Sequence, residues 1–290
     1  MGTADIVPGV SGGTVALVLG IYDRLIRNIR VGARGLKQLL TGNVAGLKQT
    51  LRDIEWLWLI ALLVGILAAV ASLSSVLERL LEEETIAMAG LFFGLVVGTI
   101  WIAWHLLERV DATAIGLIAG VGVVMFLLLG LREATDVAEG AEEIVTRPFW
   151  VFTLAGAIAI CAMILPGISG SFLLVMLGMY TEVLGAVNDR DFASLGAFVV
   201  GCVVGLALFS TLLNHLLENY RNQVIAAMIG LMVGSMRVLW PWPNGTFTTE
   251  LGAPSGEVLL PIVLALIGAT AVIAVEHFSA RVGTMPASLE

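Results

Sequence analysis

The sequence predicts an all-α, polytopic integral membrane protein with two inverted repeats, each a re-entrant helical hairpin followed by three transmembrane helices. Hydrophobic residues make up 58% of the 290 positions and charged residues only 13%, whereas soluble domains carry roughly 25% charged residues. Several apolar segments run for about 17 to 25 residues almost without charge, which is the length a helix needs to cross the hydrocarbon core. A glycine- and serine-containing motif also occurs twice. These observations place residues 1–290 in a single transmembrane domain.

Each apolar segment is expected to be a helix, because in lipid the backbone hydrogen bonds must close within the segment. Longer connections are expected only at 24–52, 132–147 and 242–257. The apolar segments are 14–22, 56–77, 86–107, 113–131, 149–165, 171–187, 193–217, 223–241 and 258–277.

Basic residues are concentrated in one connection, and this predicts the orientation of the chain. Seven of the 15 lysines and arginines lie in 24–52, and the positive-inside rule places this loop in the cytoplasm. Alternation along the chain then places the acidic stretches near 78–84 and 132–147 outside. The C-terminus is predicted to be cytoplasmic.

Two parts of the chain repeat each other. VPGVSGG at 7–13 recurs as LPGISGS at 165–171, an offset of 158 residues. Further matches occur at an offset of 140, and the longer basic loop of the first copy accounts for the difference. The matched residues are Leu19, Gly20 and Tyr22 with Leu177, Gly178 and Tyr180, and then Gly65, Leu77, Glu78, Ala87, Met88, Gly90, Leu91 and Gly94 with Gly205, Leu217, Glu218, Ala227, Met228, Gly230, Leu231 and Gly234.

Repeat one covers 1–131 and repeat two covers 149–279, and an odd number of crossings inverts the second copy. Inverted repeats are typical of secondary transporters, whose sites lie near the midplane where the copies meet. In the second copy, the segments 149–165 and 171–187 flank the motif, which predicts a re-entrant hairpin with its Pro-Gly tip inside the membrane. Two short full spans joined by a surface turn are the alternative.

The start of the chain differs from the second copy. Only seven residues precede Pro8, so the first motif has no counterpart of segment 149–165 in this sequence. Either the first hairpin is incomplete, or the protein begins further upstream. The opening residues also lack the basic and then apolar pattern of a cleavable signal peptide, so insertion is expected to rely on the spans.

The repeated Pro-Gly-x-Ser-Gly motif is predicted to interrupt a helix and start a new one. Proline removes a donor, glycine allows unusual dihedral angles, and serine caps the next helix. The new helix presents its N–H groups and the positive end of its dipole, which suit an anion such as phosphate. The candidate substrate-binding residues are Ser11, Gly12, Gly13 and Thr14 in the first copy and Ser169, Gly170 and Ser171 in the second. Glycines spaced four apart elsewhere are interpreted as helix-packing positions.

Four ionisable residues lie within or beside the spans, where charge is costly and often functional. Arg24 and Arg237 are candidates for countercharge to a phosphate, whereas Asp5 and Glu182 are candidates for carrying a coupling proton. The alternative for Arg24 is a plain position in the basic loop. The alternative for Arg237 is snorkelling to the nearby interface.

Other functional classes are disfavoured by composition. The net charge of −8 provides no basic face for nucleic acid. Cys161 and Cys202 lie inside apolar runs without metal-ligand spacing, so no metal and no cofactor is expected. The glycine-rich stretch lacks the lysine of a nucleotide-binding P-loop. No set of His, Asp and Arg residues clusters for phosphoryl transfer, so we expect a transporter and not an enzyme.

The stretches GTADIVPGVSGGTVALVLGIYDRLI, LPGISGSFLLVMLGMYTEVL and GLMVGSMRVLWPW resemble the PopT family of bacterial and archaeal membrane proteins. The resemblance covers nearly the whole chain and implies a polyprenyl-phosphate transporter that returns undecaprenyl phosphate to the cytoplasmic leaflet. The implied partners are this lipid and the membrane lipids, and the implied location is the cytoplasmic membrane. Carried over to this sequence, the resemblance implicates 5–14, 166–171 and Arg237. Family members usually have an apolar stretch before the first motif, which this sequence lacks.

The residues alone leave a second transporter hypothesis open. A small inorganic or organic anion would bind the same helix ends as the head of a lipid phosphate. A portal open to lipid between helices would favour the lipid, and a closed, water-filled vestibule would favour the small anion.

Overall fold

The structure, a computed structural model, describes residues 1–2, 11–130, 147–168, 170, 173–174, 177–245 and 250–283. Within these residues the fold is helical throughout, without strands, so the predicted all-α class is confirmed. The helices are α1 (Gly12–Val18), α2 (Tyr22–Leu40), α3 (Val44–Asp53), α4 (Trp56–Glu83), α5 (Thr85–His105), α6 (Ala112–Gly130), α8 (Phe149–Ile164), α10 (Tyr180–Asn188), α11 (Phe192–Asn219), α12 (Arg221–Ser235) and α13 (Leu259–Gly283).

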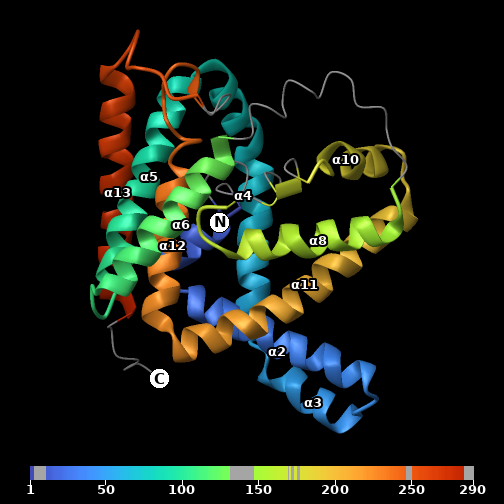
Figure 1. The fold of residues 1–290 in the computed structure, drawn as a ribbon. Helices are drawn as coiled ribbons and strands as arrows, with labels where there is room; N and C mark the ends of the chain where they lie inside the picture. The colour runs from blue at the N-terminus through green and yellow to red at the C-terminus, as the bar shows by residue number, and fades with distance from the viewer. Residues whose placement is uncertain are drawn as a thin grey trace.

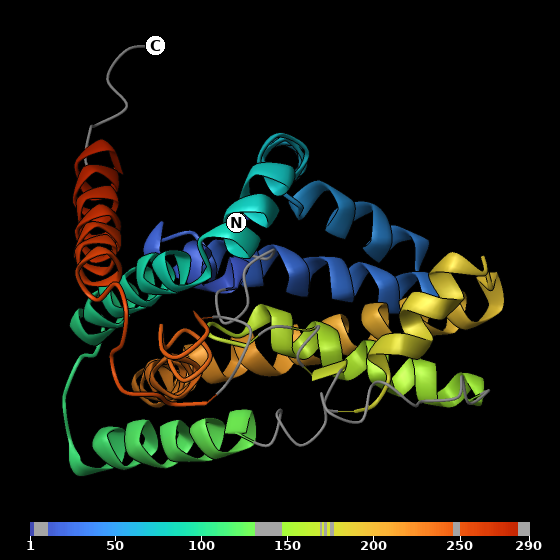
Figure 2. The same ribbon diagram turned by 90° about the horizontal axis from the view of Figure 1, so that it is seen from above.

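In the described part of the chain, five helices are long and apolar enough to cross a membrane. They are α4, α5, α6, α11 and α13, and α8 is a shorter apolar helix. Helix α13 packs beside α5, and α12 packs beside α6 and α5, while α2 and α3 extend from one end of the bundle (Figure 1). Seen from above in Figure 2, α6 and α13 lie at the margins of the bundle.

Three of the predicted apolar segments are not single helices. Segment 14–22 is interrupted between α1 and α2, where Gly20 has a φ of +66°, and segment 171–187 is interrupted before α10, where Gly178 has a φ of +58°. Ile21 N–H donates to the carbonyl of Ala16 (3.0 Å). This is the six-to-one hydrogen bond of a Schellman motif, in which a left-handed glycine ends the helix. In the second copy, the equivalent bond from Met179 N–H to the Leu174 carbonyl (2.8 Å) spans the break at Gly178.

The third corrected segment is 223–241, whose helix α12 ends at Ser235. The chain tightens there into successive turns, in which Val238 N–H donates to Ser235 and Leu239 N–H donates to Met236. Pro241 and Pro243 follow and provide no N–H with which a helix could continue. Apolar composition extends past the helix because these turn residues remain buried: Val238 and Leu239 are almost fully inaccessible.

The breaks α4–α5 and α11–α12 repeat each other closely. Glu84 has φ −126° and ψ 45°, and Tyr220 has φ −134° and ψ 38°. These two residues are 136 positions apart, whereas the flanking sequence matches at 140. The break in the second copy therefore comes four residues, or about one helical turn, earlier than the sequence repeat predicts.

The third span of each copy packs against the second span of the other copy. A Cβ added to Gly94 on α5 would overlap the carbonyl of Ala265 on α13, and one added to Gly234 on α12 would lie 2.7 Å from the carbonyl of Gly122 on α6. Glycine lets the paired backbones approach closely, which is the usual way that helices associate in lipid. The predicted packing role of these glycines is confirmed, and the exchange ties the two halves together.

Polar residues of the interhelical connections lie at the two ends of the bundle. Asp23 on α2 pairs with Arg221 (2.8 Å), and Asn222 accepts from Glu108 N–H in the α5–α6 connection (3.0 Å). At the other end, the α4–α5 junction and the start of α13 line one cavity. Figure 1 shows α2 and α3 at the lower end and the α4–α5 turn at the upper end.

We expect Gly94→Ala to destabilise the protein by about 1–3 kcal/mol, because the added methyl group overpacks the α5–α13 contact. Gly65→Ala is the matched control, since a Cβ at Gly65 on α4 would meet nothing within 4 Å. Thermal unfolding in detergent should show a lower midpoint for Gly94→Ala alone. Equal midpoints for the two variants would contradict the packing role.

Candidate functional site

The first motif enters the described structure at Ser11. Its backbone is extended (φ −124°, ψ 155°), and its hydroxyl accepts from Thr14 N–H (3.3 Å), so Ser11 is the N-cap of α1 as predicted. Ser11 and Thr14 are buried, at 2% and 3% exposure. Asp5, the candidate coupling residue of this motif, lies outside the described residues.

The second motif begins where α8 ends at Ile164. Leu165 is extended, as the residue before a proline must be. Gly167 has a φ of +86°, and a Cβ there would lie 3.0 Å from the Cα of Met232 on α12, so only glycine fits this turn. Gly170 lies close to the side chain of Met163. Ser169 and Ser171 lie outside the described residues.

The two motifs meet, although about 150 residues separate them in the sequence. The Ser11 hydroxyl donates to the Leu165 carbonyl (3.2 Å), and the Gly167 N–H donates to Thr14 Oγ1 (3.2 Å). A Cβ on Gly13 would lie 2.6 Å from the Ile164 carbonyl oxygen, so the absence of a side chain at Gly13 permits this approach. The structure thus brings Ser11, Gly13 and Thr14 together with the Pro-Gly turn of the second copy.

Tyr22 is a residue of this junction that sequence reasoning did not assign a role. Its side chain is buried, and its hydroxyl donates to the Ile164 carbonyl (3.1 Å), the last residue of α8. The only signal in the sequence was its repetition as Tyr180. Tyr22 therefore pairs one of the carbonyls left open at the end of a broken helix.

Arg237 lies in the turn that follows α12. Its guanidinium carbon is 4.7 Å from the ring centroid of Phe126 on α6, and a Cβ on Gly130 would lie 2.7 Å from it. The next residue, Val238, belongs to the same apolar cluster as Ile168 of the second motif. The structure thus places the Arg237 backbone next to the second motif, with the side chain lying on α6.

Arg24 lies near the start of α2, at the end of the bundle that carries the basic loop. It forms an ion pair with Glu55, and its guanidinium stacks on Trp58 at 4.6 Å from the ring centroid. Hydrogen bonds from Arg24 and then Asn28 hold the pKa of the Glu55 carboxyl below its usual range. The described contacts of Arg24 thus connect α2 to the start of α4.

Glu182 is buried on α10, with its side chain 6% exposed, and it is paired. Arg147 Nε donates to its carboxylate (3.0 Å), and Thr181 donates to the other oxygen (3.1 Å). Arg147 also donates to the Gly178 carbonyl at the helix break (3.4 Å). Sequence reasoning placed Arg147 only at the end of the 132–147 connection and missed this pair.

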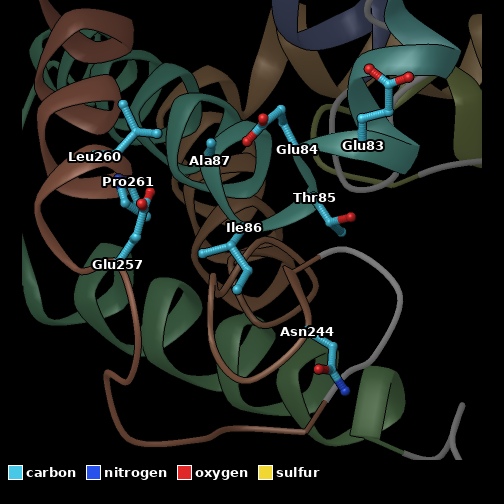
Figure 3. Close-up of a pocket in the computed structure, with 9 residues that line it drawn as sticks. All are labelled: Glu83, Glu84, Thr85, Ile86, Ala87, Asn244, Glu257, Leu260 and Pro261. Atoms are coloured by element: carbon cyan, nitrogen blue, oxygen red, sulfur yellow. The ribbon is translucent and has the colours of Figure 1, made fainter.

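A separate cavity of about 550 Å³ lies at the α4–α5 junction, and Figure 3 shows the residues that line it. Glu83, Glu84 and Glu257 contribute carboxylates, and Asn244 contributes an amide. A cleft lined by one sign of charge repels ligands of that sign, so this cavity does not suit a phosphate. Within the described residues, no group of three or more His, Cys, Asp or Glu side chains is arranged to hold a metal ion.

Comparison with known proteins identifies the family of this chain. Residues 1–254 match a family described as undecaprenyl phosphate translocase-like. The chain belongs to this family. It is 40% identical over 243 residues to the polyprenyl-phosphate transporter of Vibrio cholerae, covering 83% of this chain and 75% of that protein.

A second relative carries the same name. The chain is 30% identical over 254 residues to the polyprenyl-phosphate transporter of Staphylococcus aureus, covering 83% of each protein. No solved structure matches the chain. The resemblance predicted from the paired motifs is therefore confirmed, and the family is one of transporters.

We expect Arg147→Gln to destabilise the protein by about 1–3 kcal/mol, because it leaves the buried Glu182 carboxylate without its charged donor. The double variant Arg147→Gln/Glu182→Gln removes the buried charge as well and should recover much of the loss. Thermal unfolding of both single variants and the double variant measures the coupling. Additive losses would show that the pair contributes nothing.

Proposed function

We propose that this chain carries a polyprenyl phosphate, undecaprenyl phosphate in particular, across the cytoplasmic membrane and so recycles the lipid carrier. The phosphate is held where the two glycine-serine motifs meet. The observation that carries the proposal is the pair of contacts from Ser11 to Leu165 and from Gly167 to Thr14, which join the two copies of one motif. The names of the relatives support the lipid phosphate as the substrate.

The chemistry of this junction suits a phosphate. Two hydroxyls and a backbone N–H lie within a few ångströms of each other, and hydrogen bonds to a charged oxygen are stronger than those to a neutral carbonyl. A phosphate would exchange the present contacts of Ser11 and Thr14 for charged ones. Gly12, Gly13, Ser169, Gly170 and Ser171 complete the proposed site.

Countercharge and coupling are assigned to four residues. Arg237 and Arg24 are proposed to meet the phosphate as it moves, each on one side of the motif junction. Asp5 and Glu182 are proposed to carry a coupling proton. The buried position of Glu182 and its pairing with Arg147 support its role, because ionisable side chains inside a membrane protein are costly to keep there and usually serve function.

The proposed architecture is a pair of inverted repeats with re-entrant hairpins. Two facts support it: α4 starts at the end that carries the basic loop, whereas the equivalent helix α11 finishes there, at the Arg30–Glu218 pair. Helix α8 has 16 residues, about 24 Å, and is shorter than the roughly 30 Å of hydrocarbon. We place the basic end, and with it the C-terminus, in the cytoplasm.

We expect Ser11→Ala and Thr14→Val to slow polyprenyl-phosphate flipping in liposomes by about 10- to 100-fold, because each removes a hydrogen bond to a charged headgroup. Arg237→Ala should also slow it, and Arg237→Lys should retain part of the activity. The measurement is the rate at which a labelled polyprenyl phosphate becomes accessible in the opposite leaflet.

Ser72→Ala is the matched control for these variants. Ser72 is exposed on α4, and its hydroxyl donates to the carbonyl of Ala68 within its own helix (2.7 Å), so flipping should stay at the wild-type rate. Full activity of Ser11→Ala, Thr14→Val and Arg237→Ala together would refute the site. Release of inorganic phosphate would indicate an enzyme, and equal transport of inorganic phosphate would indicate a small-anion transporter.

We expect a cysteine at Ile168, in a background without Cys161 and Cys202, to resist labelling by a membrane-impermeant maleimide from either side. Ile168 packs beside Val238 and Leu231 and is proposed to lie at the tip of a re-entrant hairpin. Lys48→Cys, at an exposed position on α3, is the positive control for the cytoplasmic side. Rapid labelling of Ile168→Cys from the cytoplasm would show a surface turn and contradict the hairpin.

A further inference from the structure

An apolar groove of about 550 Å³ begins at the first motif. Its walls come from α1 (residues 14–19), the second half of α4 (73–80), α5 (88–99) and α13 (271–275). In Figures 1 and 2, α4 and α13 lie on either side of α5. The volume falls within the range of about 300–1,000 Å³ that is usual for sites of organic ligands.

The groove is polar at the end near the first motif and apolar along the rest of its length. Among the described residues that line it, only Thr14 and Thr99 have a polar side chain. The Thr99 hydroxyl donates to the Leu95 carbonyl in its own helix (2.8 Å), so it is already satisfied. Thr14 accepts from Gly167 N–H and belongs to the motif junction. The groove therefore has the hydrogen-bonded groups of the motif junction at its Thr14 end and hydrocarbon beyond them.

One side of the groove is open. Its floor on α5 is buried, with Met88 at 7% and Phe92 at 6% exposure. Its rims remain accessible: Val76 on α4 is 52% exposed and Val275 on α13 is 46% exposed. In a membrane these rims face lipid, so a long chain can enter the groove sideways without crossing water.

We propose that this groove holds the isoprenoid tail of the transported lipid while its phosphate occupies the motif junction. The inference rests on the proposed function and adds the path of the tail. The groove is continuous with the motif junction at Thr14 and becomes apolar away from it. A lipid phosphate has the same order, with a polar head followed by an apolar tail, so it is the occupant that fits. A soluble anion would use the junction and leave the groove empty.

Tail selection in this groove depends on shape. The tail is already in hydrocarbon before it binds, so removal from water contributes nothing, and van der Waals fit decides the affinity. Most of the lining residues are valine and leucine. We expect these branched side chains to fit the methyl branches of an isoprenoid better than a straight acyl chain.

The test is to fill the mouth of the groove. Val76→Trp should slow undecaprenyl-phosphate flipping by about tenfold, the effect of a 1–2 kcal/mol overpacking cost. Leu63→Trp is the matched control, because Leu63 lies on the same helix, is 55% exposed and does not line the groove. Competition by a short prenyl phosphate, which reports the headgroup site alone, should be unchanged in both variants.

A photoreactive benzoylphenylalanine at Leu73 provides a second readout that does not require transport. It should crosslink to undecaprenyl phosphate in preference to phosphatidic acid, whereas the same group at Leu63 should not discriminate. Wild-type flipping rates for Val76→Trp, or equal capture of the two lipids at Leu73, would overturn the groove assignment while leaving the proposed function intact. Absence of flipping by the wild-type protein would overturn the proposed function itself.

Discussion

The pairing of backbone polar groups inside an apolar fold is the constraint on which this structure depends. A broken helix leaves carbonyls and N–H groups without partners, and in lipid each one is costly. Here the Leu165 carbonyl and the Gly167 N–H of one break are paired by the Ser11 and Thr14 hydroxyls of the other. Tyr22 pairs the Ile164 carbonyl. Side chains of the first copy therefore satisfy the backbone groups that the break in the second copy leaves open.

Glycine packing holds the two halves around this junction. The α5–α13 and α6–α12 contacts each join one copy to the other, at glycines that match in the repeat. Gly205 on α11 likewise packs against Ala157 on α8, whereas its match, Gly65, has no neighbour within 4 Å. Matched glycines such as Gly94 and Gly234 thus pack in both copies, whereas Gly205 packs without its match Gly65. The repeat is not realised in packing on α4, whose apolar face is open to lipid in the described residues.

Charged residues are found at both ends of the bundle, on either side of the junction. Ion pairs such as Asp23–Arg221 and Arg30–Glu218 join helices at the basic end, and glutamates line the cavity at the other end. Between the two ends lies the uncharged junction of hydroxyls and backbone amides, with the apolar groove beside it. In the proposed function, the headgroup binds the junction and the tail binds the groove, and these two surfaces meet at Thr14.

The sequence by itself determined the helical class, the five long spans, the repeated motif and the family, because composition, apolar length and paired motifs are local properties. It also located the helix start at Ser11. It overestimated the length of the helices in segments 14–22, 171–187 and 223–241, since apolar residues continue through the turns that interrupt or end these helices. Only the tertiary structure decided which groups meet: the Thr14–Gly167 contact, the Arg147–Glu182 pair and the groove each join residues distant in sequence. Their proximity depends on how the helices pack, which no local pattern encodes.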